Sequence, residues 1–292
     1  MKIETLVNLT GGELLNSPYI SEVTSFTNRV ENVVRGGCFF VTDKNDVQKA
    51  VQSGAYAVIS EDYEEITDHE IAWIKVGSIQ KAVIDIFKYE NLQTKIYFCD
   101  EITEHILDKM NLNKEVIVLH TYEDLLRGMN IKDKYLVTSD KTFRDLFSNV
   151  EVLLAENIEL QQLSLFKSKY LTEEINLPYV YKDEFARALK FFEDHNLKYS
   201  LEFELERFKP VFVDYKLREV EYGESEKVLI KGIKNDRFFF KELNYLIDNT
   251  KHAKTVIVNE ENKSVLNEGF NFAMLVDYDM DTHLNTDEGS LF

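Results

Sequence analysis

The sequence predicts an α/β protein made of three small domains, at residues 1–90, 91–205 and 206–292. Runs of β-branched and aromatic residues alternate along the chain with segments whose apolar residues recur at helical spacing, which is the pattern of mixed α/β folds. A hydrophobic fraction of 44% with 20 phenylalanines supplies material for several cores. Because only three prolines occur, we place the domain boundaries by changes in pattern.

The first 90 residues predict the element order β-β-α-β-β-α. Strands are expected at 23–27, 38–41, 55–59 and 71–76. Asn45 or Asp46 is expected to cap the first helix, and Gly54 is expected to end it, because short polar side chains accept free amides and glycine adopts left-handed backbone. Ser78 is expected to cap the second helix, which carries apolar residues at helical spacing over 79–87.

This order resembles the amino-terminal domain of the Mur ligases, and most closely the MurF branch. Five segments match the family's motifs in order and spacing, namely 6–12 (LVNLTGG), 27–29 (TNR), 35–39 (RGGCF), 54–58 (GAYAV) and the helix at 78–87. Mur ligases add amino acids or D-Ala-D-Ala to UDP-N-acetylmuramoyl peptides. The resemblance therefore implies a cytoplasmic bacterial protein of peptidoglycan precursor metabolism, in the cell-wall pathway.

The carboxyl-terminal part also resembles MurF. The segment 177–188 is similar to the helix that closes the family's central domain, and Asp183 is its expected cap. The segment 208–220 is similar to the start of the family's last domain. A strand at 228–230, a helix at 236–248 and a strand at 255–258 are then expected in the family's order.

The resemblance implies a site for a UDP-muramoyl-type ligand in the first domain. In the family an Asp-Ser-Arg turn helps to hold the nucleotide-sugar, and Thr27, Asn28 and Arg29 stand at that turn here. Arg29 is of the type that pairs with phosphate. Thr42 is a fourth candidate, in a shortened loop after the second strand. The alternative is that residues 27–29 only stabilise a turn.

The phosphate-binding loop of the ligases is missing. The segment 94–98 predicts the first strand of a nucleotide-binding sheet, after which the family has a glycine-rich loop ending in Gly-Lys-Thr. Glycines let backbone amides approach phosphates, and the lysine neutralises their charge. Here the segment 99–104 reads CDEITE, and no glycine occurs between Gly77 and Gly128. ATP-dependent ligase activity is therefore not expected.

Three acids, Asp100, Glu101 and Glu104, are expected near the start of the following helix, where they would repel a phosphate. Lys141 and Thr142 are the residue types of a phosphate loop, but they lack a neighbouring glycine and are expected to begin a helix. Strands expected at 116–119, 135–137 and 150–154 complete a shortened Rossmann-like central domain. The family's metal-binding acids and carbamylated lysine have no counterpart, and only Asn235 matches its Asn-Ala-Asn-Pro motif.

Composition excludes several classes of partner. A net charge of −18 argues against nucleic acid and anionic membranes, which attract positive surfaces. Cys38 and Cys99 both lie in strand-like runs, which is typical of buried reduced thiols in the cytoplasm. Residues 1–9 lack the pattern of a signal peptide, and no stretch approaches the roughly 20 apolar residues of a membrane helix. No cofactor is expected.

Metal binding has two candidate patterns. Glu101 and His105 stand four residues apart and could share a metal, but an exposed polar helix face is the favoured explanation of this spacing. The acids Asp277, Asp279, Asp281 and Glu288 follow the spacing of a calcium loop without its turn glycine. A solvated acidic tail is the alternative reading of that segment.

We therefore expect a catalytically inactive Mur-ligase-like protein that acts in binding, scaffolding or regulation. Its partner would be a UDP-N-acetylmuramoyl peptide or an enzyme of peptidoglycan synthesis. One alternative is an active ligase, or another nucleotide-using enzyme, with an unconventional ATP site. Another alternative is a protein–protein interaction module, for which the phenylalanines at 238–240 are the candidate surface.

Overall fold

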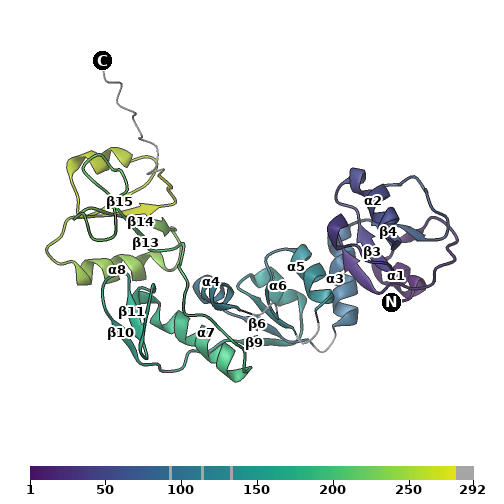
Figure 1. Cartoon of the computed structure of the whole chain (residues 1–292), viewed down its shortest axis with the longest axis horizontal. Coiled ribbons are helices and arrows are strands. Elements are labelled where there is room, and N and C mark those ends of the chain that lie inside the picture. Colours follow the sequence, from purple (N-terminus) through teal and green to yellow (C-terminus); the bar gives the residue numbers. More distant parts are fainter. Residues whose placement is uncertain (92–93, 113–114, 132–133, 281–292) are drawn as a thin grey trace, which may run out of the picture. The chain divides into compact units, whose positions relative to one another are not determined.

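The computed structural model describes residues 1–91, 94–112, 115–131 and 134–280 (Figure 1). The chain divides into two compact units, one with residues 1–104 and 113–153 and the other with residues 105–112 and 154–292. The three domain boundaries expected from the sequence stay a prediction. Among the described residues, no helix is both long and apolar enough to cross a bilayer.

The first unit begins with a five-stranded sheet in the order β1-β5-β4-β3-β2. β1 is antiparallel to β5, and the other neighbouring strands are parallel. The strands are β1 (Glu13–Leu14), β2 (Ser25–Thr27), β3 (Gly37–Phe40), β4 (Ala55–Ser60) and β5 (Ala72–Lys75). The helices are α1 (Ile3–Thr10), α2 (Val47–Gln52) and α3 (Ile79–Glu90), with 3-10 turns η1 (Val30–Asn32) and η2 (Lys44–Asp46). The predicted strands and helices are present, and α1 and β1 are additional.

The predicted cap of α3 is confirmed, whereas neither side chain predicted to cap α2 makes a cap bond. Ser78 caps α3, since its hydroxyl accepts from the amide of Lys81. Before α2 the capping residue is Asp43, which accepts from the amide of Asn45 and so starts the turn η2. Asp46 makes no cap bond with its side chain and pairs with Lys49 instead. α2 itself begins at Val47 with Asp46 at the capping position, and the 3-10 turn η2 precedes it without a break.

A second, fully parallel sheet in the first unit has the order β7-β8-β6-β9. Its strands are β6 (Ile96–Phe98), β7 (Val116–Val118), β8 (Tyr135–Thr138) and β9 (Val150–Val152). Its helices are α4 (Glu101–Met110), α5 (Tyr122–Met129) and α6 (Lys141–Leu146). This alternation confirms the reduced Rossmann-like arrangement. Lys141 and Thr142 form the first turn of α6, as expected from the absence of glycine.

Helix α3 joins the two sheets of the first unit into one core. Figure 1 shows α3 between α5 and the elements of the first sheet. Its buried residues Val83 and Phe87 belong to a cluster that reaches from Leu6 in α1 to Leu136 in β8. The ring of Phe87 also packs edge-on against Phe147, with centroids 5.8 Å apart. One hydrophobic cluster therefore contains residues from both sheets of this unit, and a second cluster around Phe39 and Trp73 belongs to the first sheet.

The second unit contains two further sheets. The three-stranded antiparallel sheet consists of β10 (Leu160–Gln162), β11 (Ser168–Tyr170) and β12 (Glu173–Ile175). The four-stranded sheet has the order β13-β14-β16-β15, with β13 (Lys209–Phe212), β14 (Val228–Ile233), β15 (Thr255–Val258) and β16 (Phe272–Val276). The helices are α7 (Lys182–Asp194) and α8 (Phe239–Asn249), with 3-10 turns η3 (Tyr179–Tyr181) and η4 (Lys263–Glu268).

The start of α7 differs from the prediction. Asp183 lies inside the first turn, and the capping position is Tyr181, whose side chain makes no cap bond. The helix can begin there because the turn η3 precedes it without a break. Figure 1 shows α8 between the four-stranded sheet and the hairpin of β10 and β11. Hydrogen bonds from Tyr245 to the carbonyl of Leu165 and from Gln162 to Asn249 hold α8 to that hairpin.

Candidate functional site

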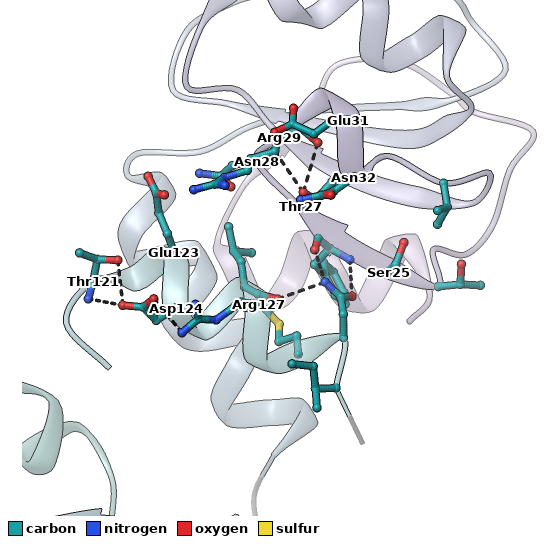
Figure 2. A pocket seen from close by; sticks show the side chains of 17 residues that line it. Ser25, Thr27, Asn28, Arg29, Glu31, Asn32, Thr121, Glu123, Asp124 and Arg127 are labelled. Atoms are coloured by element: carbon teal, nitrogen blue, oxygen red, sulfur yellow. Dashed lines mark hydrogen bonds and ion pairs between the residues drawn. The ribbon is translucent and has the colours of Figure 1, made fainter. Parts of the chain in front are cut away.

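A cavity of about 800 Å³ lies in the first unit between the end of β2 and helix α5 (Figure 2). One wall comes from residues 24–34 of the first sheet, and the other comes from residues 121–131 around α5. Its polar lining side chains include those of Thr27, Asn28, Arg29, Glu31, Glu123, Asp124 and Arg127. Two arginines and three carboxylates therefore face one space.

The structure brings together three of the four residues predicted to bind a ligand. Thr27, Asn28 and Arg29 line the cavity, whereas Thr42 is exposed after β3 and is not part of the lining. The hydroxyl of Thr27 accepts from the amide of Arg29 at 3.1 Å and donates to its carbonyl at 3.3 Å. The threonine thus stabilises the turn. The exposed guanidinium of Arg29 makes no ion pair with any described residue.

Helix α5 places charged residues on the opposite wall. Leu125 and Leu126 are buried, so Glu123 and Arg127 lie on the other faces of the helix. Asp124 closes the first turn, where its carboxylate accepts from the amides of His120 at 3.0 Å and Thr121 at 2.9 Å. Arg127 pairs with Asp124 at 3.3 Å. These residues of the site were not found from the sequence.

Asn130, just after α5, fixes the helix to the first sheet. Its side-chain amide donates to the carbonyl of Phe26 at 2.6 Å and accepts from the Phe26 amide at 3.2 Å. Phe26 is the middle residue of β2, which is an edge strand of the five-stranded sheet. Both walls of the cavity therefore belong to one hydrogen-bonded frame.

The carboxyl edge of the parallel sheet, where a nucleotide phosphate binds in proteins with a phosphate loop, is occupied by carboxylates of the chain itself. Asp100 accepts from the amides of Ile102 at 3.1 Å and Thr103 at 2.8 Å, and also from the hydroxyl of Thr103 at 2.6 Å. Asp140 accepts from the amide of Thr142 at 2.6 Å. The first amides of α4 and α6 are thus already satisfied.

Glu104 extends this arrangement into the interior. Its side chain is almost completely buried, and it accepts from the amide of Ser139 at 2.8 Å and lies 3.3 Å from Nδ1 of His120. Burial raises the pKa of Glu104, although the bond from Ser139 and the nearby His120 act in the other direction. Glu104 therefore uses the Ser139 amide, a donor at the carboxyl edge of the parallel sheet that a phosphate would otherwise need. The expected acids near the start of α4 are present, and Glu104 also accepts from Ser139, the residue that follows β8.

The second unit contains an ionic cluster of four residues, Tyr181, Arg207, Asp236 and Glu242, in which Tyr181 and Glu242 are buried and Asp236 lies at the surface. Arg207 contacts Glu242 at 2.5 Å and Asp236 at 2.6 and 2.8 Å, while the hydroxyl of Tyr181 donates to Glu242 at 2.5 Å. Burial alone would lower the pKa of Arg207, but the hydrogen bonds to Asp236 and Glu242 raise it above its ordinary value. Asp236 is next to Asn235, the one residue that was matched to the Asn-Ala-Asn-Pro motif in the sequence analysis. Both oxygens of the Asp236 carboxylate accept hydrogen bonds from Arg207.

The candidate metal ligands do not form a site among the described residues, which contain no group of three or more His, Cys, Asp or Glu side chains in metal-binding arrangement. Asp277 accepts from the amide of Asn235, and Asp279 lies 3.4 Å from Lys231. Asp281 and Glu288 lie outside the described residues. Cys38 and Cys99 are buried, as predicted, and form no disulfide within the part of the chain that the structure describes. Burial raises the pKa of Cys38.

Solved structures with a similar fold are Mur ligases. Crystal structure I of MurF from Acinetobacter baumannii aligns with 88% of this chain and 78% of its own, at 10% identity and a TM-score of 0.50. MurF ligase from Thermotoga maritima in complex with ADP aligns with 87% of this chain and 93% of its own, at 11% identity and a TM-score of 0.47. No protein-family model and no curated protein matches the chain. The chain thus has a Mur-ligase-like fold.

Proposed function

We propose that this protein is a non-catalytic binding, scaffolding or regulatory protein of bacterial peptidoglycan precursor metabolism. The cavity beside Arg29 is its ligand site, and a UDP-N-acetylmuramoyl-type precursor is the proposed ligand. The proposal that ligase activity is absent rests on one observation. The carboxylates of Asp100, Glu104 and Asp140 accept from backbone amides at the carboxyl edge of the parallel sheet.

Charge and hydrogen bonding both disfavour a triphosphate at the carboxyl edge of the parallel sheet. A triphosphate needs several free amides and a lysine at a glycine-rich turn. At this edge the amides donate to carboxylates of the chain, which also repel phosphate. Lys141, the one lysine near this edge in sequence, is in the first turn of α6 with Asp140 as its cap. ATP turnover is therefore not part of the proposal.

The ligand part of the proposal depends on Arg29. The turn after β2 is held by Thr27, so the guanidinium projects from a fixed backbone into a space large enough for a nucleotide-sugar. An arginine binds phosphate through two parallel hydrogen bonds. This is the position at which the resemblance to Mur ligases also expects the precursor.

Thermal-shift titration tests both parts. A ligand that binds only the folded state raises the melting temperature with its occupancy. UDP-N-acetylmuramoyl peptides and UDP should stabilise the wild-type protein, and Mg-ATP should not. Arg29→Ala should abolish the shift, whereas the control Arg144→Ala, which removes an arginine of α6 outside the cavity lining, should retain it.

A melting shift with Mg-ATP together with phosphate release would reject the non-catalytic proposal and support an unconventional ATP site. Shifts with UDP compounds that persist in Arg29→Ala would move the ligand away from this cavity. No shift with any UDP compound would reject the ligand part.

A second candidate function is a protein–protein interaction module, and an exposed apolar pair on α8 favours it. Phe240 is 69% exposed and Ile247 is 49% exposed, and seven residues place both on one face of the helix. Sedimentation of Phe240→Ser and of the wild type tests this function. If the protein self-associates through this face, the substitution should lower the mass of the species in solution. Equal masses would reject self-association through this face.

A further inference from the structure

We propose that helix α5 determines which ligand the cavity accepts. In this inference Arg127 supplies a second guanidinium for an anionic ligand group, and Glu123 opposes Arg29 and weakens binding of ligands with excess negative charge. The inference rests on the proposed function, because it concerns the ligand of the same cavity. It concerns residues on α5, outside the turn that the sequence pattern indicated.

Arg127 can be released for a ligand without disturbing α5. Its side chain is 58% exposed, and its contact with Asp124 at 3.3 Å is an exposed ion pair of the kind that contributes little to stability. Asp124 does not depend on Arg127, because it also accepts from the amides of His120 and Thr121. A phosphate group can therefore replace Asp124 as the partner of Arg127.

Glu123 faces the other arginine. Figure 2 shows the side chains of Arg29 and Glu123 pointing toward one another from the two walls of the cavity. Glu31 adds a second carboxylate on the side of Arg29. An anion that reaches Arg29 also lies close to Glu123. The two negative charges repel one another, and the repulsion is stronger in a partly enclosed space than in open water. We therefore expect the cavity to favour a ligand whose negative charge contacts both Arg29 and Arg127, over a ligand whose negative charge is concentrated beside Arg29 and Glu123.

A nucleotide-sugar carries more than one anionic oxygen group, and both arginines line the cavity that would hold it. Bidentate contacts of arginine with phosphate give direction as well as energy. Asn130 keeps the two walls in register through its two bonds with Phe26, so the guanidinium groups start from a preorganised frame. We therefore expect Arg127 and Arg29 to contribute together to the binding of an anionic ligand in this cavity.

Isothermal titration calorimetry of the full chain with UDP, and with uridine as the uncharged comparison, tests the inference. Arg127→Ala should weaken UDP binding by about tenfold or more, the loss typical of one charged hydrogen-bonding group. Arg127→Lys should restore part of it, because lysine keeps the charge without the fork. Glu123→Gln should strengthen UDP binding by about threefold or more, through removal of repulsion. Uridine affinity should change little in each variant.

Arg144→Ala serves as the control for loss of an arginine, and melting temperatures of all variants report whether they fold. UDP binding that disappears in Arg29→Ala but is unchanged in Arg127→Ala and Glu123→Gln would overturn the inference and leave the proposed function standing. Absence of binding of UDP and of its N-acetylmuramoyl derivatives to the wild type would overturn both. Equal losses for UDP and uridine in Arg127→Ala would assign Arg127 a packing role and also overturn the inference.

Discussion

The side-chain amide of Asn130 pairs with both backbone groups of Phe26, a residue 104 positions earlier in the chain. It accepts from the Phe26 amide at 3.2 Å and donates to the Phe26 carbonyl at 2.6 Å. Because β2 is an edge strand, the asparagine takes the place of a residue in a neighbouring strand. One side chain thus covers a sheet edge and anchors the helix that forms the opposite wall of the cavity.

Replacement of Asn130 by alanine should destabilise the first unit. Two backbone groups of Phe26 lose their partner, and each buried unsatisfied group costs about 1–3 kcal/mol. Urea unfolding should show this loss. Asn91→Ala is a matched control, because Asn91 donates one side-chain bond, to the carbonyl of Phe87, and should cost less. Equal losses in the two variants would contradict the role given to Asn130.

Replacement of Arg207 by methionine should destabilise the second unit strongly. Glu242 is fully buried. In the variant it would keep the hydroxyl of Tyr181 as a hydrogen-bond donor but lose Arg207 as its positively charged partner. An uncompensated buried charge typically costs about 3–5 kcal/mol. Chemical denaturation measures the loss. Arg218→Met, which breaks an exposed pair with Asp214, should change stability much less. A small loss in Arg207→Met would contradict the stabilising role given to the contact between Arg207 and Glu242.

Stability should fall in acid through Asp236. Burial alone would raise the pKa of Asp236, but the hydrogen bonds from Arg207 and from the amide of Phe238 outweigh it and lower the pKa. A lowered folded-state pKa means that the stabilising contribution is present above the ordinary carboxyl pKa of about 3.9 and is lost as the pH falls through the folded-state value. Asp236→Asn should flatten this acid limb in unfolding measured from about pH 5 downward. An unchanged limb would contradict the assignment.

Glu104 should act in the opposite direction. Because burial raises its pKa, its contribution to stability is largest below the ordinary glutamate pKa of about 4.3 and is lost as the pH rises through the folded-state value. Glu104→Gln keeps an oxygen that can accept from Ser139 and removes the buried charge. The stability of Glu104→Gln relative to wild type should therefore increase from about pH 4 to pH 8. A difference that does not vary with pH would reject the raised pKa.

The phenylalanines at 238–240 should behave differently from one another. Phe238 is 7% exposed and lies under the guanidinium of Arg207, 5.4 Å from the ring centre, whereas Phe240 is 69% exposed. Phe238→Ala should cost about 3–5 kcal/mol, as buried aromatic truncations do. Phe240→Ser should stay within about 0.5 kcal/mol. Thermal and urea unfolding of both variants would reveal a reversed order, which would contradict the packing described here.

Much of the fold follows from local pattern. The strands β3, β4 and β5 are nearly fully buried, so their apolar runs are continuous and legible. β1 was missed because it has two residues, both exposed, which carry no alternation. Asp43 was missed as a cap because the sequence does not show that a 3-10 turn continues into α2. Tyr181 was missed at the start of α7 for the same reason.

The candidate site was predictable on one wall. Residues 27–29 follow a short strand and match a known turn, so they are visible locally. Glu123, Arg127 and Asn130 lie about a hundred residues away on an ordinary amphipathic helix, and only the packing of α5 against β2 brings them together. Glu104 was expected to repel phosphate. Its bond to Ser139 became visible only once β6 and β8 were known to be neighbours in the sheet.

The position of α3 between two sheets affects how the chain folds as it is synthesised. When residue 90 leaves the ribosome, the parts of Val83 and Phe87 that contact the second sheet still lack their partners, which extend to Phe143. At about 5–20 residues per second, these partners follow several seconds later. During that interval the nascent chain exposes an apolar helix face. We therefore expect this stretch to be a target for transient chaperone binding during synthesis, because its core is shared between distant segments.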